Sequence, residues 1–347
     1  MSKQITIRDV AKLAQVSIAT ASRVLNNTDY PVSEQTRQKV KNAAEDLKYT
    51  PSAFAQSFRQ DVCQDIGLII PNLSNPFYLQ TMLGIDDVLS NKNYSMILCN
   101  TMRNPEREQF CLDQLYEKNI KGVILSSMNE SGESVRKYIK KGMKFVLLDQ
   151  MLNETECPSI IFDFQAGARM AVEYLINQGH KKIAFATAPM TRWSRIETYK
   201  GYQSTLASFD ISFHDSLIYE VGDVYDRPDS DLELHIGQKI GNAFMKDGCP
   251  ASAILCINDM IAIGIIQTLV KNGIRVPEDV SVIGFDDIPF ANVFMPALTT
   301  VHYPAMECGR LAALMLIDIL SSSSSEMSLS MNLKPTLIIR ETVAARK

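Results

Sequence analysis

The stretch TIRDVAKLAQVSIATASRVLN, residues 6–26, decides the fold of the first part of this 347-residue chain. It opens with Thr6-Ile7-Arg8-Asp9, the pattern of a helix capping box. The apolar residues that follow recur at intervals of three and four, which predicts one face of a short helix. The periodicity breaks at residues 15–17, where Ser17 can cap a second helix. Two short helices joined by a three-residue turn are typical of a helix-turn-helix, whose second helix enters the DNA major groove.

The second helix carries the residues that would read DNA. Its expected outward-facing residues are Ile18, Ala19, Ser22 and Arg23. An arginine can donate two hydrogen bonds to O6 and N7 of guanine, whereas isoleucine and alanine offer apolar contact to a thymine methyl group. The alternative for this segment is a helical bundle that binds nothing, and the distribution of charge argues against it.

The charge of the chain is divided between two parts. Residues 1–60 contain nine Lys and Arg against five Asp and Glu, a net charge of +4, whereas the whole chain has a net charge of −4. The remainder therefore carries −8. Basic character confined to one small module is expected where that module meets a polyanion.

Two further helices complete the first segment. Ser33 is the expected cap of a helix that runs through Leu47. Thr50-Pro51 is an N-cap followed by proline at the first helical position, which predicts a short helix at about residues 51–58. That helix is too short to be stable alone in water. We interpret residues 1–60 as an all-α DNA-binding headpiece that ends in a linker.

From Asp65 the pattern changes to short apolar runs that alternate with amphipathic helices. We predict strands at residues 66–70, 95–98, 122–125, 145–148, 159–162, 183–186, 217–219, 253–256, 280–283 and 336–339. Continuous apolar strands alternating with helices indicate parallel sheets covered on both faces. So many strands exceed one core, which predicts two α/β lobes. The serine run at residues 321–325 is interpreted as a surface loop.

Polar residues gather after the predicted strands, where open α/β sheets bind ligands. They include Asn72, Asn75, Thr101, Arg103, Ser126, Ser127, Asp149, Asp163, Arg192, Asn258, Asp259, Asp286 and Asp287. A cleft lined in this way would suit a hydroxyl-rich molecule, with Phe77 and Trp193 to cover its apolar faces. Any single aspartate could equally be a helix cap, so the prediction rests on their recurrence at strand ends.

Several classes of protein are disfavoured. We find no phosphate-binding glycine loop, no G-x-G-x-x-G after a strand, no H-E-x-x-H and no G-x-S-x-G, so we predict no enzyme activity, no cofactor and no metal site. The seven cysteines form no C-x-x-C pair and are expected to be reduced thiols. Without an export signal or a long apolar span, we expect a cytoplasmic protein that does not bind membranes. A periplasmic solute-binding protein would need that signal, and a sugar kinase fused to a DNA-binding module would need the glycine loop.

The chain resembles the lactose-repressor and galactose-repressor family of bacterial transcription regulators along essentially its whole length. The segments that carry the resemblance are Thr6–Asn26, Tyr49–Ala53, Asn75–Phe77, Gly179–His180, Val276–Asp287 and Pro296–Val301. The resemblance implies a core of the periplasmic-binding-protein type with two lobes and three crossovers. It implies discontinuous lobes, about residues 62–162 with 292–322 and about residues 163–291 with 323–347, within a core of residues 62–347. It also implies that residues 51–58 are the family's hinge helix.

The resemblance also implies roles for individual residues. The predicted DNA-binding residues are Thr6, Ser17, Ile18, Ala19, Thr20, Ser22, Arg23, Asn26, Ser52, Ala55 and Phe58. The predicted effector-binding residues are Asn75, Phe77, Asp149, Asp163, Arg192, Trp193, Arg195, Asn258 and Asp286. Two positions depart from the family. Thr198 stands where many members have arginine, so Arg192 or Arg195 is expected to take that role, and Phe58 stands where the hinge usually has leucine.

Together these observations predict a homodimeric repressor of transcription that binds a pseudo-palindromic operator on double-stranded DNA. Its operator affinity is expected to be under allosteric control by a small effector, such as a sugar, a sugar acid or a related metabolite, held between the two lobes. A role in carbohydrate metabolism would follow. Whether the effector is an inducer or a corepressor stays open.

Overall fold

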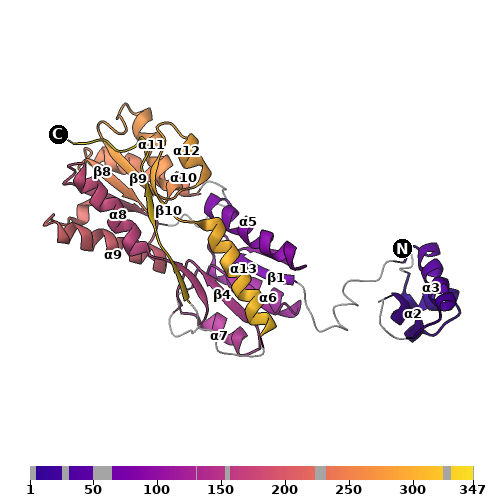
Figure 1. The fold of residues 1–347 in the computed structure, drawn as a ribbon. Helices are drawn as coiled ribbons and strands as arrows, with labels where there is room; N and C mark the ends of the chain where they lie inside the picture. The colour runs from indigo at the N-terminus through magenta and orange to yellow at the C-terminus, as the bar shows by residue number, and fades with distance from the viewer. Residues whose placement is uncertain are drawn as a thin grey trace. The chain divides into compact units, whose positions relative to one another are not determined.

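A computed structural model of the chain describes residues 5–25, 31–49, 65–129, 131–152, 157–222, 232–322 and 330–346. The chain divides into two compact units, Met1–Gln64 and Asp65–Lys347, and Figure 1 shows the helices and strands of each. The hinge helix predicted at residues 51–58, and most of the serine run, lie outside the described residues.

The first unit contains three helices, α1 (Ile7–Leu13), α2 (Ile18–Leu25) and α3 (Glu34–Asp46). Two of the predicted caps are confirmed, because the Ser17 hydroxyl accepts a hydrogen bond from the backbone N of Thr20 at 3.0 Å and Ser33 accepts one from Thr36 at 3.3 Å, while Thr50 lies outside the described residues. Small and branched side chains from all three helices form the core: Val10, Ala11, Ala14, Ala21, Val24, Val40, Ala43 and Ala44. The helix-turn-helix predicted from residues 6–26 is therefore present.

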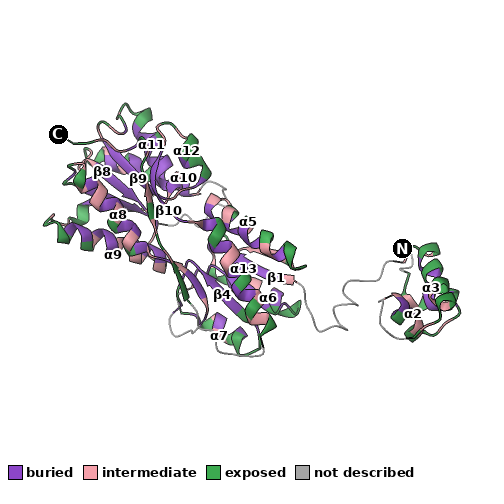
Figure 2. Ribbon diagram, in the orientation of Figure 1, coloured by how far each residue is buried: buried purple, intermediate pink, exposed green. Residues whose placement is uncertain are grey.

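The second unit contains two six-stranded sheets, each the centre of one lobe. The first sheet has the order β11-β5-β4-β3-β1-β2 and is parallel throughout. Its strands are β1 (Asp65–Ile70), β2 (Ser95–Asn100), β3 (Gly122–Leu125), β4 (Lys144–Leu148), β5 (Ser159–Phe162) and β11 (Ser330–Leu333). Its helices are α5 (Pro76–Asn91), α6 (Pro105–Glu117), α7 (Glu133–Ile139) and α13 (Ala305–Ser321). Figure 2 shows that the inner strands are largely buried, whereas the edge strands β2 and β11 are not.

The second sheet has the order β12-β10-β9-β8-β6-β7, in which only β12 is antiparallel to its neighbour. Its strands are β6 (Ile183–Thr187), β7 (Ile218–Glu220), β8 (Ala253–Cys256), β9 (Ser281–Asp286), β10 (Thr299–His302) and β12 (Thr336–Ile338). Its helices are α8 (Phe164–Asn177), α9 (Trp193–Ser208), α10 (Leu232–Lys246), α11 (Asp259–Lys271) and α12 (Pro289–Val293), with a 3-10 turn at Asp215–Leu217.

Every predicted strand has a counterpart, but β10 and β11 were not predicted as strands, and they change the lobe boundaries. We expected residues 292–322 in the first lobe and residues 323–347 in the second. Instead, β10 pairs with β9 in the second sheet, and β11 pairs with β5 in the first. The chain therefore crosses between the lobes after β5, after β10 and between β11 and β12. Within the described residues, no helix has both the length and the apolar character needed to cross a membrane.

Two glycines let α5 and α13 pack with their backbones in direct contact. A Cβ atom at Gly84 would overlap the carbonyl oxygen of Met306, and one at Gly309 would overlap that of Thr81. Because both obstacles are backbone atoms of the opposite helix, a side chain at either position cannot be relieved by a change of rotamer. The two helices can approach this closely only with glycine at these sites.

We predict that Gly84→Ala lowers the free energy of unfolding of the core by roughly 1–3 kcal/mol, measured by urea denaturation. Alanine favours a helix over glycine by about 1 kcal/mol, so a loss of stability would show that the interhelical overlap dominates. Gly222→Ala is the matched control, because nothing lies within 4 Å of a Cβ atom there. Equal stability of the two variants would contradict the prediction.

Candidate functional site

A cavity of about 60 Å³ lies at the carboxyl ends of the strands of both sheets, between the two lobes. The first lobe contributes Pro71, Asn75, Phe77, Tyr78, Arg103 and Asp149. The second lobe contributes Phe164, Arg192, Ser194, Arg195, Thr198, Glu233, Ile257, Asn258, Phe285 and Asp286, and the crossover after β10 adds Tyr303. This is where an open α/β sheet places its ligand.

Three charged residues of the cavity have a left-handed backbone. Arg103 has φ 58°, Asp149 has φ 56° and Asp286 has φ 109°. Side-chain-bearing residues adopt these angles at an energetic cost, and such strain gathers where a structure must aim a group at a ligand. The strain at these three residues therefore marks them as candidates for ligand binding rather than for stabilising the fold.

A buried carboxylate holds the turn that presents Asp286. Asp259, at the first turn of α11, accepts hydrogen bonds from the backbone N of Ile288 at 2.8 Å and from the Thr300 hydroxyl at 2.6 Å. Burial raises the pKa of Asp259 to about 7. Asp287, which follows Asp286, accepts one hydrogen bond from Arg340 at 2.6 Å and lies 2.9 Å from His302 Nδ1. The position of Asp286 is thus fixed by groups on both sides of it.

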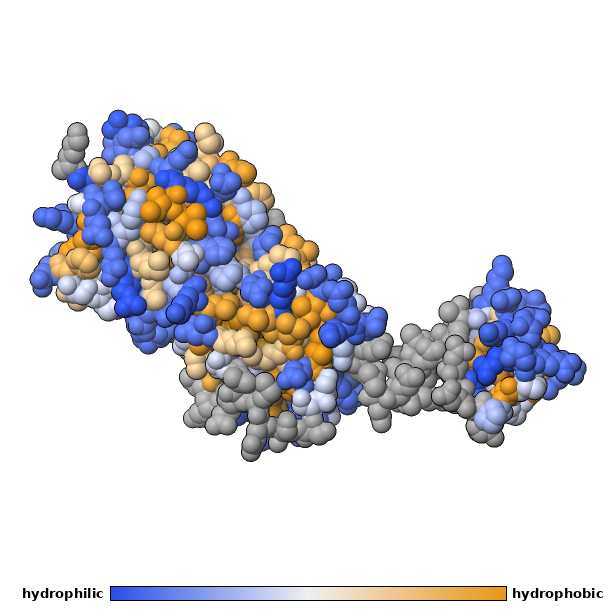
Figure 3. All heavy atoms as spheres, viewed as in Figure 1, coloured by the Kyte–Doolittle hydropathy of each residue, from blue (hydrophilic) through white to orange (hydrophobic). Residues whose placement is uncertain are grey.

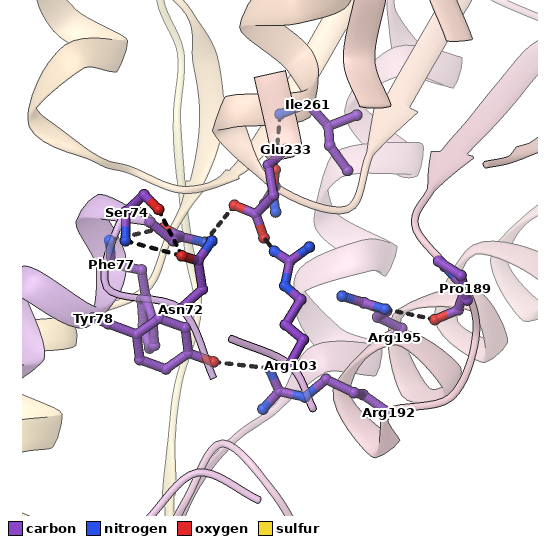
Figure 4. A network of polar contacts seen from close by, with 12 residues as sticks. Asn72, Ser74, Phe77, Tyr78, Arg103, Pro189, Arg192, Arg195, Glu233 and Ile261 are labelled. Atoms are coloured by element: carbon purple, nitrogen blue, oxygen red, sulfur yellow. Dashed lines mark hydrogen bonds and ion pairs between the residues drawn. The ribbon is translucent and has the colours of Figure 1, made fainter. Parts of the chain in front are cut away.

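Arg192, the N-cap residue of α9 in the second lobe, reaches into the first lobe. Its guanidinium donates to the Tyr78 hydroxyl at 2.8 Å, to the Ser126 hydroxyl at 2.9 Å and to Asp149 Oδ2 at 3.3 Å. Figure 4 shows the contact of Arg192 with Tyr78. One side chain of the second lobe therefore binds three groups of the first.

Glu233, in the first turn of α10, makes the reciprocal bridge from the second lobe. Its carboxylate accepts a hydrogen bond from Asn75 Nδ2 at 2.8 Å and forms a buried ion pair with Arg103, both in the first lobe. Figure 4 shows the contact of Glu233 with Arg103. Each lobe thus supplies one arginine to a carboxylate of the other, and the two ion pairs hold the lobes together around the cavity.

Three buried polar atoms of the cavity have no hydrogen-bond partner within the part of the chain that the structure describes. They are Arg103 Nη1, Arg192 Nε and Asp149 Oδ1. An unpaired buried donor or acceptor is costly, so each marks a place for a ligand atom or a water molecule. Burial raises the pKa of Asp286 well above its ordinary value, and the nearby carboxylates of Asp259, Glu233 and Asp149 raise it further.

Aromatic rings form the apolar walls. Phe77 stacks on Tyr303 with ring centroids 4.9 Å apart, and Phe164 stacks on Phe285 at 6.0 Å. Trp193 packs against Phe164 with its ring edge-on, at a centroid distance of 5.7 Å. Phe164 therefore lines the cavity, and Trp193 supports it from behind.

Seven of the nine predicted effector-binding residues line this cavity: Asn75, Phe77, Asp149, Arg192, Arg195, Asn258 and Asp286. The structure does not bring Asp163 and Trp193 to it, since both line a neighbouring pocket next to Phe164. Asp163 caps α8 by accepting a hydrogen bond from the backbone N of Ala166 at 2.9 Å, which is the helix-cap alternative for an aspartate after a strand. Asn75 and Asn258 also cap helices, α5 and α11, while they face the cavity.

The predicted effector residues omit several members of the cavity. Arg103 was predicted among the polar residues that follow strands and line the cleft, but not among the effector-binding residues. Glu233 follows β7 only after a long connection and had no local signal. Thr198 lines the cavity together with both Arg192 and Arg195, so the two arginines lie where the family resemblance expects one.

The first unit exposes five of the seven predicted DNA-binding residues that the structure describes. Ile18 is 45% exposed, and Ala19 and Arg23 are exposed beside it on α2. Thr6 and Ser17 are exposed at the starts of α1 and α2, and Thr20 is half-buried. Ser22 does not face outward as predicted. It is only 3% exposed, because α2 turns the side that carries Ala21, Ser22 and Val24 towards the interior of the unit. Asn26, Ser52, Ala55 and Phe58 lie outside the described residues.

Comparisons with known proteins agree with this arrangement. Residues 6–52 match the bacterial regulatory proteins of the lacI family, and residues 63–337 match the periplasmic binding proteins and sugar binding domain of the LacI family. The chain is 33% identical over 337 residues to the NTD biosynthesis operon regulator NtdR of Bacillus subtilis (strain 168), covering 97% of this chain and 99% of that protein.

Two solved structures are similar along most of their length. A Lac repressor dimer bound to operator and the anti-inducer ONPF has a TM-score of 0.83 and 25% identity, covering 99% of this chain and 100% of that one. A LacI family regulator from Enterococcus faecium with bound ribose has a TM-score of 0.71 and 26% identity, covering 82% of this chain and 100% of that one. Among the described residues, no cluster of His, Cys, Asp and Glu could hold a metal ion.

Burial of Asp149 predicts that the unfolding free energy of the core depends on pH. Burial raises the pKa of Asp149 from 3.8 to about 6, although Arg192 and Arg195 lower it. Folding therefore takes up a proton between these values, and the stability that protonated Asp149 contributes is lost as the pH rises through about 6. Relative to Asp149→Asn, the wild type should lose on the order of 1–3 kcal/mol of unfolding free energy between about pH 4 and pH 7.5 in urea denaturation. A difference between the two proteins that is the same at both pH values would contradict this.

Proposed function

The chain belongs to the lacI family of bacterial regulatory proteins, DNA-binding regulators of transcription, and we propose from its cavity and its exposed α2 which ligand and which DNA contacts it uses. We propose that it is a repressor whose operator affinity is controlled by a small sugar bound between the two lobes. The observation that carries this proposal is the set of unpaired atoms in the cavity, two donors and one acceptor, set among aromatic walls.

A hydroxyl-rich ligand fits these atoms better than other small molecules. A hydroxyl group can accept a hydrogen bond from Arg103 Nη1 or Arg192 Nε and donate one to Asp149 Oδ1. Phe77 and Phe164, on opposite lobes, offer flat surfaces to the apolar faces of a sugar ring. The Enterococcus faecium relative was solved with ribose, which is a molecule of this class.

The charges of the cavity favour a neutral sugar over a sugar acid. Arg103 is already paired with Glu233, and Arg192 with Asp149. A ligand carboxylate that used Arg103 or Arg192 would have to displace a protein carboxylate from one of these buried pairs, and breaking such a pair is costly. Hydroxyl groups can use the unpaired atoms without disturbing either ion pair. We therefore propose a neutral sugar or polyol as the effector.

Binding of the effector would couple the two lobes. Asp149 follows a strand of the first lobe and Asp286 ends a strand of the second, so a ligand held by both biases the lobes towards one orientation. A ligand acts on DNA affinity only through its difference in affinity for two such states, and couplings of this kind are typically about 1–3 kcal/mol. The same scheme serves an inducer or a corepressor.

We propose that α2 reads the operator through Ile18, Ala19 and Arg23. These three residues are exposed on one helix of a helix-turn-helix, and Arg23 can form the two-pronged contact to guanine. Ser17 and Thr20, whose hydroxyls lie 2.9 Å apart at the start of α2, would hold a phosphate of the DNA backbone.

We also propose a homodimer that binds a pseudo-palindromic operator in the cytoplasm, as one headpiece alone gives little specific affinity. The core exposes large apolar residues in and after α12, where Val293 is 71% exposed and Met295 is 80% exposed. Figure 3 shows a second gathering of hydrophobic residues over α13, where Met306 and Leu314 are exposed. Both are surfaces that a second copy of the chain would cover.

Asp286→Ala tests the effector site. A thermal-shift series of neutral pentoses, hexoses and polyols, with the corresponding sugar acids and nucleosides, should identify a neutral ligand. At 100 times its Kd that ligand should stabilise the wild type by about 2.7 kcal/mol. The variant should lose this shift and keep operator affinity without ligand. Asp163→Ala is the control, since it removes a helix cap outside the cavity and should lower Tm without abolishing the shift. A normal ligand response of Asp286→Ala would refute the site.

Arg23→Ala tests the reading of DNA. If Arg23 contacts a guanine, the variant should bind the best operator about 1–3 kcal/mol more weakly and lose its preference at one base pair, measured by anisotropy titrations on single-substitution duplexes. An equal loss on all duplexes would mean that Arg23 binds a phosphate. Arg37→Ala, on α3, is a control for the removal of one positive charge from the same unit.

A further inference from the structure

The amino edge of the first sheet is lined with lysines. In a parallel sheet every helix-to-strand connection lies at this edge, and here the three connections are residues 92–94, 118–121 and 140–143. They contain five lysines and no acidic residue, and a sixth lysine opens β4. We call this set the lysine edge; all its members are exposed: Lys92, Lys118, Lys121, Lys140, Lys141 and Lys144.

The pairing of the strands brings these connections together. Gly122, which follows Lys121, lies opposite Lys144 on one side and Ile66 on the other. On the far side of β1, Asp65 lies opposite Ser95, at the end of the connection that holds Lys92. None of the six lysines forms a salt bridge with a carboxylate of the described residues, although Lys141 Nζ lies 4.5 Å from the ring centroid of Tyr116. The lysine edge is therefore a band of positive charge with few acidic groups beside it, namely Asp65 at the start of β1 and Asp113, whose pKa Lys141 helps to lower.

The second sheet provides an internal comparison. Lysines after a helix can simply complement its dipole, and this explanation should hold equally for both lobes. The corresponding connections of the second lobe, residues 178–182, 209–217, 247–252 and 272–280, contain three basic residues and five acidic ones. Since the architecture is the same, helix dipoles do not explain why only the first lobe lacks acidic residues in its helix-to-strand connections.

The lysine edge is also where the polypeptide enters the core. Asp65 is the first residue of β1 and of the second unit, and the chain before it leads to the helix-turn-helix unit. We propose that the lysine edge binds the phosphates of duplex DNA that flanks the sequence read by α2. Lysine suits this role because its flexible point charge attracts phosphates without reading bases. The core would then add sequence-independent affinity to the specific contacts of the headpiece.

The test compares short and long duplexes with the full-length protein. An operator obtained by selection from random duplexes is prepared alone and with about 20 base pairs of random sequence on each side, and affinity is measured by anisotropy over a range of salt concentrations. Each phosphate contact adds roughly 0.9 to the slope of log K against log salt. The wild type should bind the long duplex with a steeper slope, by about 2 to 3, and roughly tenfold or more tightly at low salt.

The triple variant Lys121→Gln, Lys140→Gln, Lys144→Gln should lose the advantage of the long duplex and keep its affinity for the short one. The matched control is Lys181→Gln, Lys182→Gln, Lys271→Gln, which removes three exposed lysines from the same edge of the second lobe. It should behave as the wild type. An unchanged Tm of both variants shows that the core is folded.

Two outcomes would overturn this inference. Equal affinity and salt slope of the wild type on the short and the long duplex would mean that the lysine edge does not bind flanking DNA and meets another partner. Equal losses in the triple variant and its control would mean that only overall charge matters. This inference rests on the proposed function. Failure of that function would look different from both outcomes, because the wild type would then bind neither the short nor the long duplex.

Discussion

Two buried ion pairs join the lobes around the cavity. Each lobe supplies the arginine of one pair and the carboxylate of the other. Arg192 of the second lobe pairs with Asp149 of the first, and Arg103 of the first pairs with Glu233 of the second. Because all four side chains are buried, separating the lobes would leave two arginines and two carboxylates to be rehydrated. Burial raises the pKa of Asp149 to about 6, so the pair of Arg192 with Asp149 carries a desolvation cost.

Other contacts in the site keep these four charged side chains in position. Arg103, Asp149 and Asp286 lie at or after the ends of strands and have a left-handed backbone, and the buried Asp259 holds the turn that follows Asp286. Asn75 caps α5 with its side-chain oxygen and donates to Glu233 with its nitrogen, so one residue links helix geometry to lobe contact. At these positions the same residues stabilise the fold and form the site.

The sequence predicted features that depend on neighbours along the chain, and it failed where distant partners decide. Ser17 and Ser33 could be identified as caps because the acceptor and the donor are three residues apart. Glu233 had no such signal, since its partners Asn75 and Arg103 are 158 and 130 residues away. The burial of Ser22 and the position of Trp193 behind Phe164 depend on how a helix is rotated, and residue types alone do not settle that. The lobe boundaries that the family resemblance implied are wrong at β10, which pairs with β9, and at β11, SMNL, which has no apolar run and pairs with β5.

The three crossovers also set the order in which the chain can fold during synthesis. The first sheet begins at residue 65 and has five of its strands by residue 162, but α13 and β11 come only at residues 305–333. Until then β3, β4 and β5 lack the helix that packs on them, and the edge of β5 lacks its neighbour. At about 5–20 residues per second, this interval lasts on the order of ten seconds or more. The nascent lobe must therefore spend that time with an apolar face and a strand edge uncovered, which makes it a natural client for a chaperone at the ribosome.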